Sequence, residues 1–171
     1  ANVIATDMGG TSFEVGLIVD GAPLVQEETV IDKYVYRIPK LDVTSIAAGG
    51  GSIAWVDEIN GTIQVGPRSA GADPGPACYG RGGTLATVTD ANVVLGHLPP
   101  RLLGGAMQLD VDAAHAAVER VAEERGTGVH ETARAIVDMV DEAMLGALRV
   151  VTVQRGRAPG EFALVAFGGA G

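Results

Sequence analysis

The feature that most constrains the fold is the stretch Asp7-Met8-Gly9-Gly10-Thr11-Ser12-Phe13-Glu14-Val15, in which a glycine pair separates two apolar runs. Residues 2–7 and 13–19 have the pattern of β-strands, so the glycines form the tight turn between them. Glycine lets a backbone turn sharply and approach a ligand closely. The stretch therefore predicts two adjacent strands, joined either by an ordinary hairpin turn or by a ligand-binding loop.

This turn carries groups that suit a phosphate chain and a metal ion. Successive N–H groups around Gly9 and Gly10 can point at phosphoryl oxygens, and Thr11 and Ser12 add hydroxyl donors. Asp7 can hold Mg²⁺ directly or through water. We therefore expect these four turn residues to bind phosphate, and Asp7 to be a metal ligand and a catalytic carboxylate.

Composition limits what else the chain can do. It has 171 residues, 47% of them apolar, which is enough for one domain with a buried core. A net charge of −9 without a basic stripe argues against nucleic acid and anionic membranes as partners. The single cysteine, Cys78, excludes an intramolecular disulfide, and no apolar run approaches the ~20 residues that span a bilayer. These properties favour a cytoplasmic protein, and both ends read as cut from a longer polypeptide.

The rest of the chain reads as further strands and three helices. A hairpin turn at Asp20-Gly21 leads to a third strand, and a second hairpin turns at Asn60-Gly61. Helical spacing and capping residues predict two long helices and one short helix that runs from an N-cap at Asp90 toward Leu95. The remaining expected elements are strands at 24–30, 34–38, 53–56, 62–65 and 162–167, and helices at 112–125 and 130–149.

A second glycine turn, residues 168–171, directly follows the expected last strand. If this strand and the first one belong to the same sheet, residues 9–12 and 168–171 line one edge of it. Ligands of α/β sheets bind at such an edge. The pair of turns therefore favours a ligand site more than either turn does alone.

Each of the other candidate residues and segments allows two interpretations of its role. Asp90 is either a helix cap or a carboxylate in a cleft, and Cys78 is either a nucleophile or, without a nearby histidine, inert. The glycine- and proline-rich residues 66–84 form either an ordered functional loop or a connector. Residues 49–54 formally fit a dinucleotide fingerprint, but they follow no clear strand and lead into a hairpin, so we expect a structural or phosphate-adjacent turn instead.

The order of these motifs resembles that of the hydantoinase A and 5-oxoprolinase family. The turn at Asp7 looks like the second phosphate-binding segment of the actin, Hsp70 and sugar-kinase ATPase fold, and Gly168-Gly169-Ala170 resembles its adenosine-binding segment. One departure is Glu14, where the family usually has aspartate. The motifs that carry the resemblance lie at residues 7–12, 48–54, 66–83, 87–92 and 166–171.

The resemblance implies an α/β fold, the ribonuclease H-like second half of the ATPase fold, with a mixed sheet, an inserted hairpin and the Gly/Pro-rich loop. Residues 1–171 would then be a single partial domain with an insertion at about 40–110. The implied activity is the ATP-dependent opening of a cyclic amide such as hydantoin or 5-oxoproline, in which the ring carbonyl is activated by phosphorylation and the C–N bond is then cleaved by water.

The resemblance also implies the ligands and partners. Gly9, Gly10, Thr11 and Ser12 would hold the phosphates of ATP, and Asp7 would engage Mg²⁺. The adenosine would lie beside the turn at 168–170. Asp90 stays a candidate catalytic carboxylate. The implied partners are the cyclic amide substrate, the rest of the same polypeptide and a hydantoinase B-like subunit.

Two other functions remain open. The related subunit of an ATP-dependent acetone or ketone carboxylase shares these motifs. The chain would otherwise be a non-catalytic interaction module whose glycine turns shape a subunit interface.

Overall fold

The structure is a computed structural model that describes residues 1–170. It contains thirteen strands and three α-helices within these residues. The strands are β1 (Val3–Met8), β2 (Phe13–Val19), β3 (Ala22–Pro23), β4 (Val25–Gln26), β5 (Thr29–Ile31), β6 (Tyr34–Tyr36), β7 (Lys40–Leu41), β8 (Val43–Ile46), β9 (Ser52–Val56), β10 (Ile63–Ser69), β11 (Arg101–Leu102), β12 (Met107–Gln108) and β13 (Ala163–Phe167). The α-helices are α1 (Val88–Val94), α2 (Val111–Arg125) and α3 (Val129–Val151).

The largest sheet has five strands and is mixed. β1 pairs antiparallel with β2 and parallel with β13, while β3 and β8 share the other edge of β2. The Asp20-Gly21 turn after β2 has positive φ angles of 52° and 83°, as a tight hairpin requires. β8 belongs to this sheet although it falls inside the expected insertion at about 40–110, whereas β4–β7 and β9–β12 lie outside the sheet.

The helices begin and end at residues that satisfy their free backbone groups. The Asp110 carboxylate accepts a hydrogen bond of 2.9 Å from the N–H of Ala113 at the start of α2, and Gly126 ends the helix with φ 72°. α3 follows after a short turn and presents an apolar stripe at helical spacing. Both long helices predicted from the sequence are therefore confirmed.

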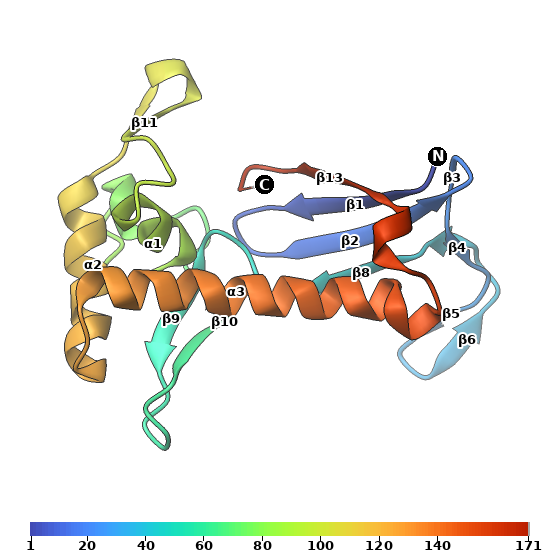
Figure 1. The fold of residues 1–171 in the computed structure, drawn as a ribbon, viewed down its shortest axis with the longest axis horizontal. Helices are drawn as coiled ribbons and strands as arrows, with labels where there is room; N and C mark the ends of the chain where they lie inside the picture. Colours follow the sequence, from blue (N-terminus) through green and yellow to red (C-terminus); the bar gives the residue numbers. More distant parts are fainter. Residues whose placement is uncertain (171) are drawn as a thin grey trace.

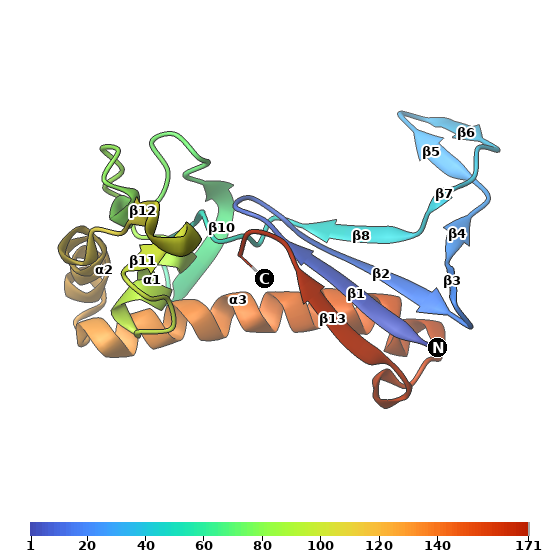
Figure 2. The ribbon, with the colours of Figure 1, turned by 90° about the horizontal axis from the view of Figure 1, so that it is seen from above.

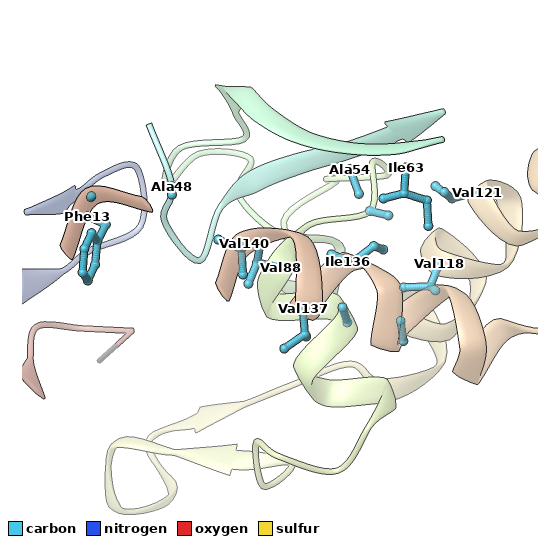
Figure 3. Close-up of a cluster of buried hydrophobic side chains, with 14 of the residues drawn as sticks. Phe13, Ala48, Ala54, Ile63, Val88, Val118, Val121, Ile136, Val137 and Val140 are labelled. Carbon is cyan, nitrogen blue, oxygen red and sulfur yellow. The ribbon is translucent and has the colours of Figure 1, made fainter. Parts of the chain in front are cut away.

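The long helix α3 runs along the length of the molecule (Figure 1). The five-stranded sheet lies along one half of α3, while α1, α2 and the β9–β10 hairpin gather around its other half. Side chains on one face of β2 are buried toward α3, among them Phe13, Val15 and Leu17. Figure 3 shows the other part of the core, where side chains of β9, β10, α1, α2 and α3 pack together.

The segment after β2 differs from the expected single strand at 24–30. It forms short strands instead: β3 pairs with β2, β4 pairs with β7, and β5 pairs with β6 around Asp32, which has φ 58°. The β5–β6 hairpin stands away from the rest of the molecule (Figure 2). Its valines and tyrosines are exposed, so within the described residues it packs on no core of its own.

No helix in the described part of the chain has both the length and the apolar composition that a membrane crossing needs.

Candidate functional site

The structure brings the two glycine turns together at one end of the sheet. β1 and β13 run parallel with Asp7 opposite Phe167, so both strands end at the same edge. The N–H of Ala170 donates a hydrogen bond of 2.8 Å to the carbonyl of Met8. Residues 9–12 and 168–170 are therefore neighbours, as the sequence predicted; the last residue of the predicted turn, Gly171, lies outside the described residues.

Gly168 is the point of closest approach between the turns. It has φ 102°, and a Cβ at this position would collide with the Asp7 carboxylate and lie 2.5 Å from the Met8 carbonyl oxygen. Only glycine fits both this backbone conformation and this space. The Asp7 carboxylate is consequently held between the turn that ends β1 and the turn that ends β13.

Within residues 1–170, the carbonyl groups of Gly9 and Gly10 accept hydrogen bonds from the protein, whereas the N–H groups of Gly10 and Thr11 have no protein acceptor. The carbonyl of Gly9 accepts from Gly50 at 3.0 Å, and that of Gly10 accepts from Gly51 at 2.6 Å. Among residues 1–170, the N–H groups of Gly10 and Thr11 donate to no protein atom. Consecutive free N–H groups in a turn form a concave donor site for an anion.

Two carboxylates accompany this turn. Asp7 and Glu14 lie directly opposite each other on β1 and β2 and therefore share one face of the sheet. The hydroxyl of Ser12 donates to Oε1 of Glu14 at 3.2 Å, while Thr11 is exposed. No group of three His, Cys, Asp or Glu side chains with metal-binding geometry occurs in the part of the chain that the structure describes. A cation here would depend on one or two carboxylates and on oxygens from a ligand.

The glycine run Gly49–Gly51 lies against the first turn, which confirms that it is a turn beside residues 9–12 and not a dinucleotide fingerprint. It follows strand β8, which the sequence pattern did not reveal, and leads into strand β9 instead of a helix. A Cβ at Gly49 would lie 2.6 Å from the Thr11 nitrogen, which is too close for any side chain. The sequence predicted a structural or phosphate-adjacent turn here, but it did not predict the contact with Thr11.

Asp90 lies inside the first turn of α1 and not at the N-cap position that the sequence predicted. The N-cap of α1 is Thr87, and Asp90 is the third helical residue, which completes a capping box. The Asp90 carboxylate is 0% exposed. It accepts hydrogen bonds from the N–H groups of Ala77, Cys78 and Thr87 and from the Thr87 hydroxyl, at 2.8–3.2 Å. Asp90 therefore fixes a loop to the start of α1, and its carboxylate does not line the cavity between the sheet and α3.

Residues 66–84 are ordered, and Cys78 is buried in them. The first part of this segment continues β10, and a 3₁₀ turn follows at Ala77–Tyr79. Burial raises the pKa of the Cys78 thiol, and the negative charge of Asp90 raises it further. A buried thiol with a raised pKa is a poor nucleophile, which supports the inert reading of Cys78.

A cavity of about 680 Å³ opens beside the turns, between the sheet and α3. Glycine-turn residues Gly10, Gly50, Gly169 and Ala170 form its rim at the sheet edge. Most of its wall is apolar, and the polar side chains in it include Thr89, Asn92 and Asp141. Burial and the nearby Asp138 raise the pKa of Asp141. The apolar wall is formed by Met8, Phe13, Val88, Leu98, Leu102, Val137, Val140, Met144, Leu145, Leu148, Leu164, Ala166 and Phe167.

Comparison with known sequences identifies a protein family and several relatives of this chain. The family described as hydantoinase/oxoprolinase matches residues 1–171. Caprolactamase subunit alpha of Pseudomonas jessenii is 45% identical over 171 residues, and the match covers 99% of this chain and 24% of that protein. The acetophenone carboxylase gamma subunit of Aromatoleum aromaticum is 46% identical over 175 residues, with 99% and 24% covered.

Solved structures agree with the sequence comparison. A nucleotide-free structure from work on ATP-dependent acetone carboxylation matches with a TM-score of 0.89 and 31% identity, covering 99% of this chain and 24% of that one. The crystal structure of the ATP-dependent caprolactamase of P. jessenii matches with a TM-score of 0.87 and 45% identity, covering 99% and 25%. The expected α/β ATPase fold with a mixed sheet is thereby confirmed.

This chain spans about a quarter of the length of these relatives. The family match nevertheless extends over all of its residues, and the matched structures superpose over 99% of them. The chain belongs to the hydantoinase/oxoprolinase family.

Proposed function

We propose that this chain is part of an ATP-dependent hydrolase that opens cyclic amides, and that residues 9–12 bind the phosphates of ATP. The proposal rests on the adjacency of the two glycine turns at the ends of β1 and β13, where the N–H groups of Gly10 and Thr11 have no acceptor within residues 1–170. The two structures compared above come from an ATP-dependent caprolactamase and from ATP-dependent acetone carboxylation, which supports an ATP site here.

The residues at the turn fit Mg²⁺-ATP. Apart from Gly10 and its two chain neighbours, no atom of residues 1–170 lies within 4 Å of the position that a Cβ of Gly10 would take, so a phosphoryl group can approach the backbone there. The N–H groups of Gly10 and Thr11 and the Thr11 hydroxyl are the proposed phosphate donors. Asp7 is the proposed metal ligand, with Glu14 beside it, because Mg²⁺ in phosphate sites takes few protein carboxylates and keeps oxygens from water and phosphate.

Gly168, Gly169 and Ala170 are the proposed neighbours of the adenosine. Their turn lies against the end of β1, so a nucleotide whose phosphates lie at residues 9–12 would pass beside them. When bound, ATP would supply the phosphoryl group that turns an amide oxygen into a leaving group. The residues of this chain would position the nucleotide and neutralise its charge. Asp90 enters the proposal as a positioning residue instead of a catalytic one, because its carboxylate is fully buried.

The rest of a longer polypeptide is the proposed partner that completes the site. Every residue of β13 is exposed, although a strand in a parallel pair is normally covered on both faces. Leu164 and Phe167 are 61% and 50% exposed. Since the relatives are about four times as long and two of them are named as subunits, we infer that further polypeptide, and a hydantoinase B-like subunit, cover these surfaces.

A second candidate function is the ATP-dependent carboxylation of a ketone. It is favoured by the 46% identity to the acetophenone carboxylase gamma subunit and by the TM-score of 0.89 to the acetone carboxylase structure. The nucleotide site would be the same, and only the acceptor of the phosphoryl group would differ.

Two experiments on the complete protein test these proposals. Thr11→Ala and Ser12→Ala should each lower ATP turnover, and unchanged turnover in both variants would contradict the phosphate assignment. A substrate screen with hydantoin, 5-oxoproline, caprolactam, and acetone or acetophenone with bicarbonate should show ATP hydrolysis coupled to a cyclic amide. Coupling to a ketone and bicarbonate instead would select the carboxylase.

A further inference from the structure

The glycine run Gly49–Gly51 touches both glycine turns and the start of α1, although it belongs to neither strand of the proposed nucleotide site. We propose that this run is a positioning segment that aims the N–H groups of Gly10 and Thr11 at the phosphates. The inference rests on the proposed function, because it takes residues 9–12 as the phosphate turn.

The hydrogen bonds of the run determine how the peptide groups of the turn are oriented. In a trans peptide the C=O and the following N–H point in opposite directions. The carbonyl of Gly9 points at the N–H of Gly50, so the N–H of Gly10 points away from the run. The carbonyl of Gly10 points at the N–H of Gly51, so the N–H of Thr11 also points away from it. Two consecutive donors thus face the side opposite the run.

The space between the run and the turn admits no side chain. A Cβ at Gly49 would lie 2.6–2.7 Å from both atoms of the peptide bond between Gly10 and Thr11. A Cβ at Gly51 would lie 2.7 Å from the Gly10 carbonyl oxygen. Such distances do not occur for real Cβ atoms, so a side chain at either position must push the turn away.

Gly50 connects this arrangement to the second turn and to α1. A Cβ there would lie 2.8 Å from the Thr89 hydroxyl and 3.2 Å from the Cβ of Ala170. The carbonyl of Gly50 accepts from both the N–H and the hydroxyl of Thr89, each at 2.8 Å. Thr89 is 7% exposed and lies next to Asp90, whose buried carboxylate fixes the start of α1. The bonds from Thr89 hold the run in place, so the N–H groups of Gly50 and Gly51 keep pointing at the carbonyls of Gly9 and Gly10.

The simpler reading is that the run only connects β8 with β9. A connector would need neither three glycines at contact distance from the turn nor a buried threonine bound twice to its central carbonyl. The two readings differ in a measurable way. A side chain on a connector lowers stability alone, whereas a side chain on the positioning segment changes the affinity for phosphate groups.

Gly49→Ala in the complete protein tests the proposal. We expect its affinity for ATP in the presence of Mg²⁺ to fall at least tenfold, while its affinity for AMP, measured by competition, changes less than twofold. The matched control is Gly160→Ala, because a Cβ there meets no atom within 4 Å and Gly160 lies in a separate turn before β13. The control should bind both nucleotides as the wild type does.

Thr89→Val provides a second test if Gly49→Ala fails to fold, because it removes the hydroxyl without changing the shape of the side chain. We expect a threefold to tenfold loss of ATP affinity, restored in Thr89→Ser. If the wild type binds ATP and Thr89→Val binds it equally well, the positioning role is wrong and the proposed function stands. If the wild type binds no nucleotide, the proposed function itself fails, and this inference fails with it.

Discussion

The guanidinium of Arg155 donates two hydrogen bonds to the carboxylate of Asp42, and so joins the 3₁₀ turn Val153–Arg155, which follows α3, to the residue directly before β8. Gln26 donates a third hydrogen bond to the same carboxylate at 2.6 Å. The Asp42 side chain is 8% exposed. This contact therefore attaches the projecting segment of residues 25–41 to the turn that directly follows α3.

Asp42→Asn should destabilise the protein by about 1–3 kcal/mol, because a buried charge-assisted pair loses its charge while Arg155 stays in place. The hydrogen bonds from Arg155 hold the pKa of Asp42 below its ordinary value of 3.8. The ionised carboxylate thus contributes stability above that value, and the contribution is lost as the pH falls through the lower pKa of the folded state. Urea unfolding between about pH 6 and pH 3 measures this.

The control for this prediction is Glu28→Gln, because Glu28 forms an exposed ion pair with Arg37. An exposed pair contributes little to stability, so this variant should unfold like the wild type at every pH. A difference between wild type and Asp42→Asn that stays constant down to pH ~3 would show that the charge of Asp42 is not the cause.

Asp90→Asn should be among the most destabilising single changes in the chain, by about 3 kcal/mol or more. The N–H groups of Ala77, Cys78 and Thr87 all donate to the two oxygens of the Asp90 carboxylate. Asparagine would replace one of these oxygens with an NH₂ donor, so at least one of the three N–H groups would lose its acceptor. Thermal unfolding compared with Asp110→Asn, which keeps an oxygen for the single exposed capping bond of α2, measures the difference. Equal melting temperatures would contradict the role assigned to Asp90.

Cys78 should resist thiol reagents at pH ~8, because its side chain is 0% exposed and burial raises its pKa. The rate of labelling should rise in a variant that releases residues 77–79, such as Asp90→Ala. Cys78→Ala should leave ATP turnover within about twofold of the wild type. Rapid labelling of the native wild type, or a complete loss of turnover in Cys78→Ala, would contradict the inert assignment and favour Cys78 as a nucleophile.

The sequence predicted the parts of the fold whose signals are local. The strands on both sides of Gly9-Gly10, the Asn60-Gly61 hairpin and the two long helices follow from periodicity, turn residues and caps. The meeting of the turns at 9–12 and 168–170 was predictable because parallel strands end at a common edge of a sheet. These elements depend on neighbours in sequence or on one simple rule of topology.

The remaining features depend on contacts that sequence patterns do not reveal. Strands β3 to β7 are two or three residues long, which is too short to show an alternating pattern. The sequence pattern predicts an N-cap at Asp90, but Thr87 three residues earlier has the Thr-x-x-Asp spacing of a capping box and is the N-cap in the structure. The place of Gly49–Gly51 against Thr11 is set by packing between segments almost forty residues apart, so only the structure shows it.

The most direct test of the central claim is a calorimetric titration of the complete protein with Mg²⁺-ATP, comparing the wild type with Gly10→Ala. Within the described residues, a Cβ at Gly10 meets no atom within 4 Å beyond its two chain neighbours, so the variant should fold normally. The added methyl group would occupy the space in which the phosphate approaches the turn. We expect the wild type to bind ATP and Gly10→Ala to bind it at least tenfold more weakly. Equal ATP affinity in the two proteins, or no binding by the wild type, would contradict the claim that residues 9–12 hold the phosphates.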